Sequence, residues 1–157
     1  GEIVSGGTMG ILITSTVIYL HSSIIDYSTI LLAVPTAIYI GTILLSNNIN
    51  DLVEDKAAGR KTLPILIGIK NAEKLWIAKT IMLLVLTTLF VILNIYPILT
   101  IIAAVLLFPY TSLKEFLSFE KCANAKGRTM GLIVKLGIRY HISIYIGLLL
   151  AIIIRGV

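Results

Sequence analysis

Long apolar stretches alternate with short polar connections along the chain. A helix that crosses the hydrocarbon core of a bilayer needs about 20 largely apolar residues, and five stretches approach that length. Alternation over segments of about ten residues, which is typical of membrane β-barrels, is absent. The pattern therefore predicts an all-α polytopic membrane helix bundle with five transmembrane helices, at Ile3–Leu20, Thr29–Leu45, Leu75–Leu93, Ile95–Leu107 and a stretch that ends at Ile154.

The start of the fifth stretch has two interpretations. It begins near Leu132 if Lys135 and Arg139 extend to the lipid headgroups, and near Ile142 if they do not. The composition of the connections indicates one membrane domain over residues 1–157.

The basic residues lie almost entirely on one side of this arrangement. Five lie between the second and third stretches, with Lys79 just beyond, and six lie between Leu107 and Ile142. Of the 13 basic residues only Arg155 lies on the opposite side. The positive-inside rule places the basic side in the cytoplasm. The net charge of +5 is thereby explained by topology in the cell membrane rather than by a nucleic-acid partner.

Two further features lie in the connection before the fifth stretch. Apolar and charged residues are interleaved from Leu113 to Lys121, which predicts a short helix on the inner membrane surface. The single cysteine, Cys122, has no second cysteine for an internal disulfide and is interpreted as an ordinary reduced thiol.

The most informative polar segment follows the second apolar stretch, from Ser46 to Lys74. Asn47, Asp51 and Asp55 are spaced four residues apart, so on a helix they lie along one face. Two carboxylates one turn apart repel each other, and near the membrane interior a cation between them would relieve the repulsion. Carboxylate and amide oxygens suit a hard divalent ion such as Mg²⁺, which often completes its shell with substrate phosphates.

Basic residues follow the acids directly. Arg60 and Lys61 next to an Mg²⁺ site would bind a diphosphate and stabilise the negative charge that accumulates on it as it departs. The alternative is that this polar loop is simply solvated and that its charges serve topology; the spacing alone leaves both interpretations open.

The segment Asn47–Gly68, NNINDLVEDKAAGRKTLPILIG, resembles the second aspartate-rich motif of the UbiA superfamily of intramembrane prenyltransferases. Its N-N-x-x-D-x-x-x-D-x-x-A-G-R-K-T-L form is most similar to the 1,4-dihydroxy-2-naphthoate prenyltransferases of menaquinone synthesis. Gly1-Glu2 resembles the opening of the family's fifth helix, and Leu136–Arg155 resembles its ninth. The resemblance implies that this chain holds the last five of nine membrane helices.

The family transfers a prenyl group from a polyprenyl diphosphate to an acceptor that is often aromatic. Carried over to this sequence, Asp51 and Asp55 would be catalytic Mg²⁺ ligands, while Asn47, Arg60 and Lys61 would bind the diphosphate. Nothing in the chain matches the family's first aspartate-rich motif, so we expect the C-terminal part of a longer chain whose missing N-terminal half completes the site.

Other functions remain open at this stage. Within the superfamily, the acceptor could instead be 4-hydroxybenzoate, haem, homogentisate or a glycerophosphate lipid. Outside it, the chain could be a non-catalytic half-size scaffold or a transporter subunit, although no paired repeat of the kind common in transporters is visible.

Overall fold

The computed structural model describes residues 1–107 and 126–155, and every regular element in this part of the chain is helical, which confirms the predicted all-α class. In chain order the elements are α1 (Glu2–Ser5), the π-helix η1 (Gly6–Leu12), α2 (Ile13–Ser22), α3 (Tyr27–Asn50), α4 (Leu52–Ala57), α5 (Leu63–Ile67), α6 (Ile69–Ile92), α7 (Ile98–Leu107) and α9 (Lys126–Arg155). The predicted surface helix at Leu113–Lys121 and Cys122 lie outside the described residues.

Three helical segments are long and apolar enough to cross a membrane: Glu2–Ser22, Ile30–Asn50 and Ile69–Ile92. Their large apolar side chains are widely exposed, as at Ile3 and Ile92, which suits contact with lipid rather than water. These segments make the chain a membrane protein. The count of five crossings is not confirmed: α7 has ten described residues, and the described apolar part of α9, Ile138–Ile154, is shorter than the three spans.

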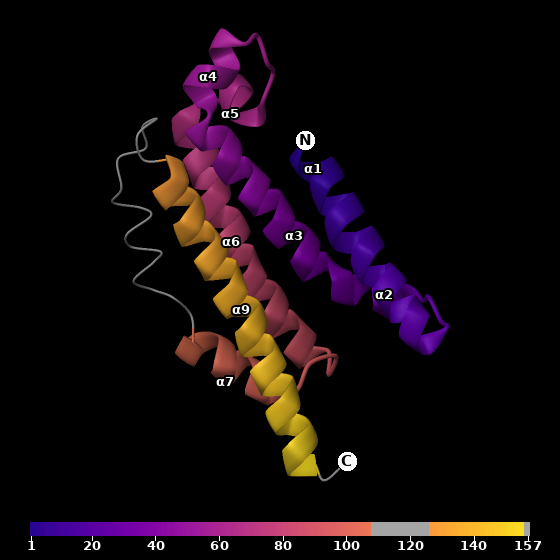
Figure 1. The fold of residues 1–157 in the computed structure, drawn as a ribbon. Helices are drawn as coiled ribbons and strands as arrows, with labels where there is room; N and C mark the ends of the chain where they lie inside the picture. The colour runs from indigo at the N-terminus through magenta and orange to yellow at the C-terminus, as the bar shows by residue number, and fades with distance from the viewer. Residues whose placement is uncertain (108–125, 156–157) are drawn as a thin grey trace. The chain divides into compact units, whose positions relative to one another are not determined.

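The described residues form two compact units, the first containing Gly1–Leu83 and the second Leu84–Leu107 with nearly all of α9. A single membrane domain over residues 1–157 stays a prediction. In the first unit, α1, η1 and α2 form one continuous helical segment that runs antiparallel beside α3 (Figure 1). Pro35 lies inside α3, a position tolerated in membrane helices because neighbouring helices can satisfy the freed backbone group.

Glycines allow the backbones of η1 and α3 to approach closely. A Cβ atom added at Gly10 would lie 2.3 Å from the Cα of Ala37, and one added at Gly6 would lie 2.6 Å from the carbonyl oxygen of Ala37. Small residues spaced four apart commonly permit such contact between membrane helices. The resulting packing fixes the start of α1 against the second half of α3.

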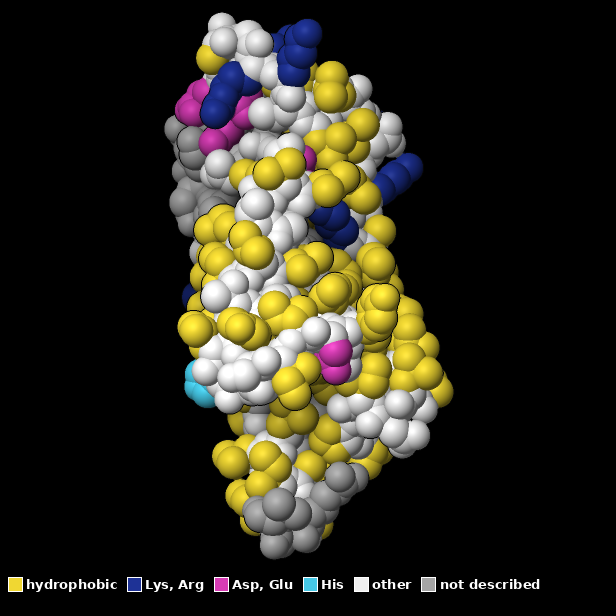
Figure 2. Space-filling view, turned by 90° about the vertical axis from the view of Figure 1, so that its right-hand side faces the viewer, with side chains coloured by type: hydrophobic (Ala, Val, Ile, Leu, Met, Phe, Trp, Pro, Cys, Tyr) yellow, Lys and Arg dark blue, Asp and Glu magenta, His cyan; other side chains and the backbone are white. Residues whose placement is uncertain are grey.

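The short helices α4 and α5 follow the end of α3 and reverse the chain direction. Thr62 is extended before α5, Pro64 lies at the start of that helix, and Gly68 ends it with a φ of 80°. Around this end the Lys, Arg, Asp and Glu side chains gather, whereas hydrophobic side chains predominate over α1 and α2 (Figure 2). The fold thus places a polar cap at one end of an apolar helix pair.

The second unit packs the end of α6 and α7 against α9. The hydroxyl groups of Thr87 and Tyr140 are hydrogen-bonded to each other, and both side chains are fully buried. Gly147 lets α9 approach α7, since a Cβ there would lie 2.5 Å from the Cα of Thr100.

Candidate functional site

The three predicted acidic and amide positions lie on successive turns where α3 passes into α4. The backbone N–H of Asp51 donates to the carbonyl oxygen of Asn47 over 2.9 Å, and the N–H of Asp55 donates to the carbonyl of Asp51 over 2.8 Å. Asp51 itself, with φ −91° and ψ 7°, separates the two helices. The helical hydrogen-bond pattern therefore continues across this break, and the predicted one-turn spacing is present.

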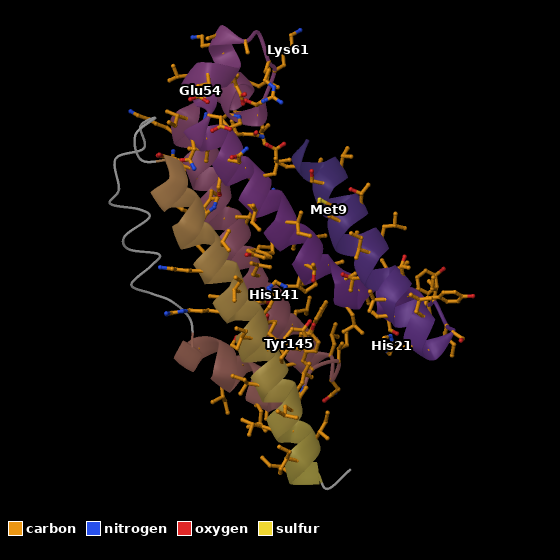
Figure 3. The ribbon with its side chains drawn as sticks, in the orientation of Figure 1. Met9, His21, Glu54, Lys61, His141 and Tyr145 are labelled. Carbon is orange, nitrogen blue, oxygen red and sulfur yellow. The ribbon has the colours of Figure 1, made fainter. Side chains whose placement is uncertain are left out.

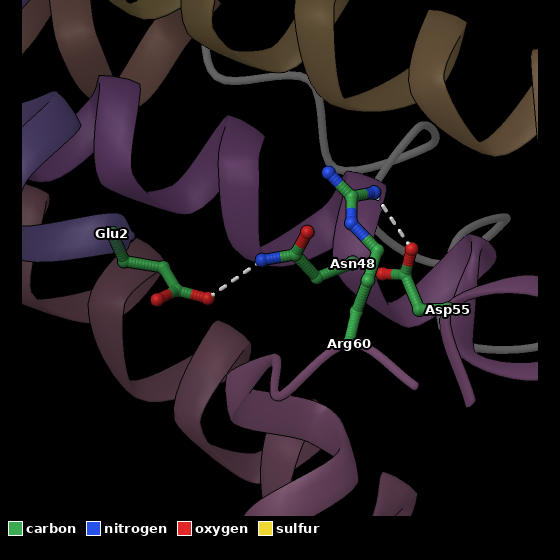
Figure 4. Close-up of polar contacts among 4 residues, drawn as sticks. All are labelled: Glu2, Asn48, Asp55 and Arg60. Carbon is green, nitrogen blue, oxygen red and sulfur yellow. Dashed lines mark hydrogen bonds and ion pairs between the residues drawn. The ribbon is translucent and has the colours of Figure 1, made fainter. Parts of the chain in front are cut away.

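Asp55 is the most enclosed of these residues, with 4% of its surface exposed. The Arg60 guanidinium donates from Nη1 to Asp55 Oδ1 over 2.8 Å, and the backbone N–H of Arg60 donates to the carbonyl oxygen of Asp55 over 2.8 Å (Figure 4). Gly59 makes this return possible, because its φ of 69° is a conformation that side chains disfavour. The predicted metal ligand Asp55 and the predicted diphosphate-binding residue Arg60 are thus brought together by a turn in which they lie five positions apart.

The second carboxylate oxygen of Asp55 is buried, and no described residue hydrogen-bonds to it. An ionised oxygen left in this state is costly, and a cation beside it removes the cost. Asp51, one turn earlier, is half-buried, whereas Glu54 is exposed. The Asp51–Asp55 pair therefore fits a divalent ion better than Glu54 does.

Among the described residues, no group of three or more His, Cys, Asp or Glu side chains could hold a metal ion. This is compatible with Mg²⁺, which usually takes one or two protein carboxylates and fills the remaining positions with water and substrate phosphate. The donors present fit a metal that is bound together with a phosphorylated ligand.

A polar pocket of about 400 Å³ lies beside this turn. Of the predicted site residues, Arg60 and Lys61 line it, while Asn47, Asp51 and Asp55 do not. The Arg60 side chain is 67% exposed, so most of its five N–H donors remain accessible while one holds Asp55. The pocket is lined by Gly1, Glu2, Leu44, Asn48, Arg60, Lys61, Thr62 and Leu63.

Glu2 and Asn48, two lining residues for which the sequence predicted no role, are joined to each other. Glu2 is 9% exposed, and its Oε1 accepts a hydrogen bond of 2.9 Å from Asn48 Nδ2 (Figure 4). The two residues lie 46 positions apart, so no local spacing could join them. The only sequence signal was a carboxylate at the very start of an apolar stretch, a position where a charge is expensive.

Side chains at the opposite end of the first helical segment take no part in the pocket. Lys61 and Glu54 lie at the polar end, whereas His21 lies near the far end of α2 (Figure 3). His21 is exposed, and its ring nitrogen Nδ1 contacts the carbonyl oxygen of Val17 one turn earlier. The predicted site residues all lie at the end of α3 that carries α4 and α5.

The polar pocket is lined by two cationic side chains, Arg60 and Lys61, and Arg60 joins it to the buried Asp55 just beyond a helix long enough to cross a membrane. The sequence model of the UbiA prenyltransferase family matches residues 1–133, and the chain belongs to this family. It is 45% identical over 75 residues to the 1,4-dihydroxy-2-naphthoate octaprenyltransferase of Bacillus subtilis (strain 168). That match covers 48% of this chain and 24% of the relative. No solved structure matches the chain.

Proposed function

We propose that the protein transfers a prenyl group from a polyprenyl diphosphate to an aromatic acceptor such as 1,4-dihydroxy-2-naphthoate, in an Mg²⁺-dependent reaction. The observation that carries the proposal is the buried Asp55. One of its carboxylate oxygens is held by Arg60, which lines the polar pocket, and no described residue donates a hydrogen bond to the other. Membership of the UbiA prenyltransferase family and the naphthoate-prenylating relative support the reaction class.

The proposed site residues fall into two groups by the charge of their ligand. Asp51 and Asp55 would hold Mg²⁺, with Asn47 one turn earlier supporting them. Arg60 and Lys61 would bind the diphosphate in the polar pocket that they line, since guanidinium and ammonium groups both bind phosphate oxygens. The Asp55–Arg60 ion pair connects the proposed metal site with the diphosphate pocket, because the Arg60 guanidinium contacts Asp55 and also lines the pocket.

The reaction begins when the bond between the allylic carbon and the diphosphate oxygen breaks and both bonding electrons leave with the diphosphate. The positive charges of Arg60 and Lys61 stabilise the negative charge that the leaving group gains. A bound Mg²⁺ would add a further positive charge at the same oxygens. A ring carbon of the acceptor then bonds to the allylic carbon and releases its proton.

The acceptor and the side of the membrane belong to the proposal as well. The naphthoate-prenylating relative favours a dihydroxynaphthoate over 4-hydroxybenzoate, homogentisate, haem or a glycerophosphate lipid. The excess of Lys and Arg next to the aspartates favours a cytoplasmic position for the site.

The test is prenyl transfer by the complete gene product in proteoliposomes, with each candidate acceptor supplied separately. We expect a prenylated naphthoate product that disappears when EDTA removes divalent ions and returns when Mg²⁺ is added. Transfer that persists in EDTA would contradict the metal assignment. No product with any acceptor, from protein that is folded and inserted, would favour the scaffold or transporter alternative.

A further inference from the structure

Glu2 lies where two pockets meet. The polar pocket described above adjoins an apolar one of about 300 Å³, and Glu2 is the residue that lines both. The shared wall is one face of α3, whose residues at intervals of three or four point in the same direction. Going from the apolar to the polar pocket, this face contributes Ala37, Ile38, Gly41, Leu44 and Asn48.

The apolar pocket contains one cation, Lys79 of α6. A Cβ atom at Gly41 would lie 3.2 Å from the ammonium nitrogen of Lys79 and 3.0 Å from the backbone oxygen of Glu2. The missing side chain at Gly41 therefore gives room for the ammonium group against α3, next to the start of α1. Ile3, Ile11 and Met82 supply apolar walls.

Lys79 lies inside a segment long and apolar enough to cross a membrane, about 7 Å further along α6 than Lys74. It is half-buried, and no hydrogen bond or ion pair within 4.0 Å joins it to any described residue. Glu2 Oε1 instead accepts a hydrogen bond from Asn48, and Glu2 Oε2 lies 3.8 Å from the terminal amine of Gly1. An ionisable residue at such a depth is expensive to keep and commonly marks a functional site.

We propose that Glu2 and Lys79 form the subsite for the aromatic acceptor, with the Lys79 ammonium binding an acceptor carboxylate and the Glu2 carboxylate accepting a hydrogen bond from an acceptor hydroxyl. The inference rests on the proposed function. The ligand class is a planar hydroxyaryl carboxylate, since the pocket offers apolar walls for a ring and one group of each charge at its polar end.

This placement would bring the acceptor next to the reacting bond. A diphosphate held by Arg60 and Lys61 has its ester oxygen in the polar pocket, and Glu2 borders that pocket directly. An acceptor held at Glu2 would then present its ring to the allylic carbon. Positioning two reactants in this way is a large source of rate enhancement.

Equilibrium binding of three ligands to the complete gene product in detergent tests the subsite without turnover. The ligands are 1-hydroxy-2-naphthoate, 1-naphthol, which lacks the carboxylate, and 2-naphthoate, which lacks the hydroxyl. Lys79→Met should weaken the binding of the two carboxylate ligands by about 10- to 100-fold and leave the affinity for 1-naphthol within about twofold. Glu2→Gln keeps the shape of the side chain. It should weaken the binding of the two ligands that carry a hydroxyl by about tenfold and leave the affinity for 2-naphthoate unchanged.

The control variant is Lys74→Met, which removes an exposed charge from the same helix and should change no affinity. The ligand that each variant spares also reports that the variant is folded. Equal losses for all three ligands, or unchanged binding of both carboxylate ligands in Lys79→Met, would overturn the inference. The predicted binding pattern without any prenyl transfer would contradict the proposed function but support the subsite.

Discussion

Arg60 connects the two parts of the candidate site, because it touches a buried acid and also lines the diphosphate pocket. Its bond to Asp55 uses a single guanidinium nitrogen, and a planar guanidinium can present other N–H groups to a second anion at the same time. A lysine at this position would carry the same charge, but its ammonium group cannot hold Asp55 and a phosphate in this fixed geometry.

Arg60→Lys is therefore expected to raise the KM for the prenyl diphosphate by about tenfold while the acceptor KM changes little. Steady-state kinetics with one substrate varied at a time measures the two constants. Lys70→Gln is the control, since it removes an exposed charge that lies outside the pocket. An unchanged KM for the prenyl diphosphate in Arg60→Lys would contradict a role of Arg60 in binding the diphosphate.

At the residue level, the sequence predicted the helical spacing of Asn47, Asp51 and Asp55 because that spacing is local. It also predicted that Arg60 and Lys61 lie next to the acids, and the structure brings Arg60 onto Asp55. Glu2 and Lys79 could not be placed, because their neighbours come from α3 and depend on how three helices pack. The roles of Asn47, Asp51, Asp55, Arg60 and Lys61 in catalysis remain predictions.

At the level of the elements, the contact between η1 and α3 holds the start of α1 in position. That contact depends on Gly10, where a methyl group would lie 2.3 Å from the Cα of Ala37 and no flexible side chain could give way. The Gly6–Gly10 spacing is a sequence signal of such a contact, yet sequence spacing does not identify the facing helix.

Gly10→Ala should destabilise the protein by about 1–3 kcal/mol, because the two backbones must move apart. Gly7→Ala is a matched control in the same π-helical segment, since nothing lies within 4 Å of an added methyl group there. Thermal unfolding in detergent should show a lower Tm for Gly10→Ala alone. Equal Tm values for the two variants would contradict the close packing of η1 on α3.

At the level of the whole molecule, the lengths of the apolar stretches predicted the helical class and the three long spans, because a helix needs about 20 apolar residues to cross the bilayer. The predicted boundaries differ from the observed ones where polar residues extend a helix beyond its apolar stretch. The second stretch was predicted to end at Leu45, whereas α3 continues to Asn50 because helical hydrogen bonding tolerates the polar residues at its end.

The antiparallel pairing of the first helical segment with α3 predicts that Ser23 and Lys70 face opposite sides of the membrane. In a background from which Cys122 and any other cysteine of the complete gene product have been removed, a membrane-impermeant maleimide added to intact cells should label Ser23→Cys but not Lys70→Cys. Permeabilised cells should label both. Labelling of Lys70→Cys from outside would reverse the topology and place the aspartates on the outer face.

The central claim is that Asp51 and Asp55 support prenyl transfer, and its most direct measurement is the Mg²⁺-dependent transfer rate of aspartate variants in the complete gene product. Asp51→Asn and Asp55→Asn should each lower the rate by about 100-fold or more, since each loses a charged metal ligand. Glu54→Gln, which alters an exposed acid on the same short helix, should keep a rate within about twofold of the parent protein. Near-normal rates in both aspartate variants, with the protein inserted in the membrane, would contradict the account.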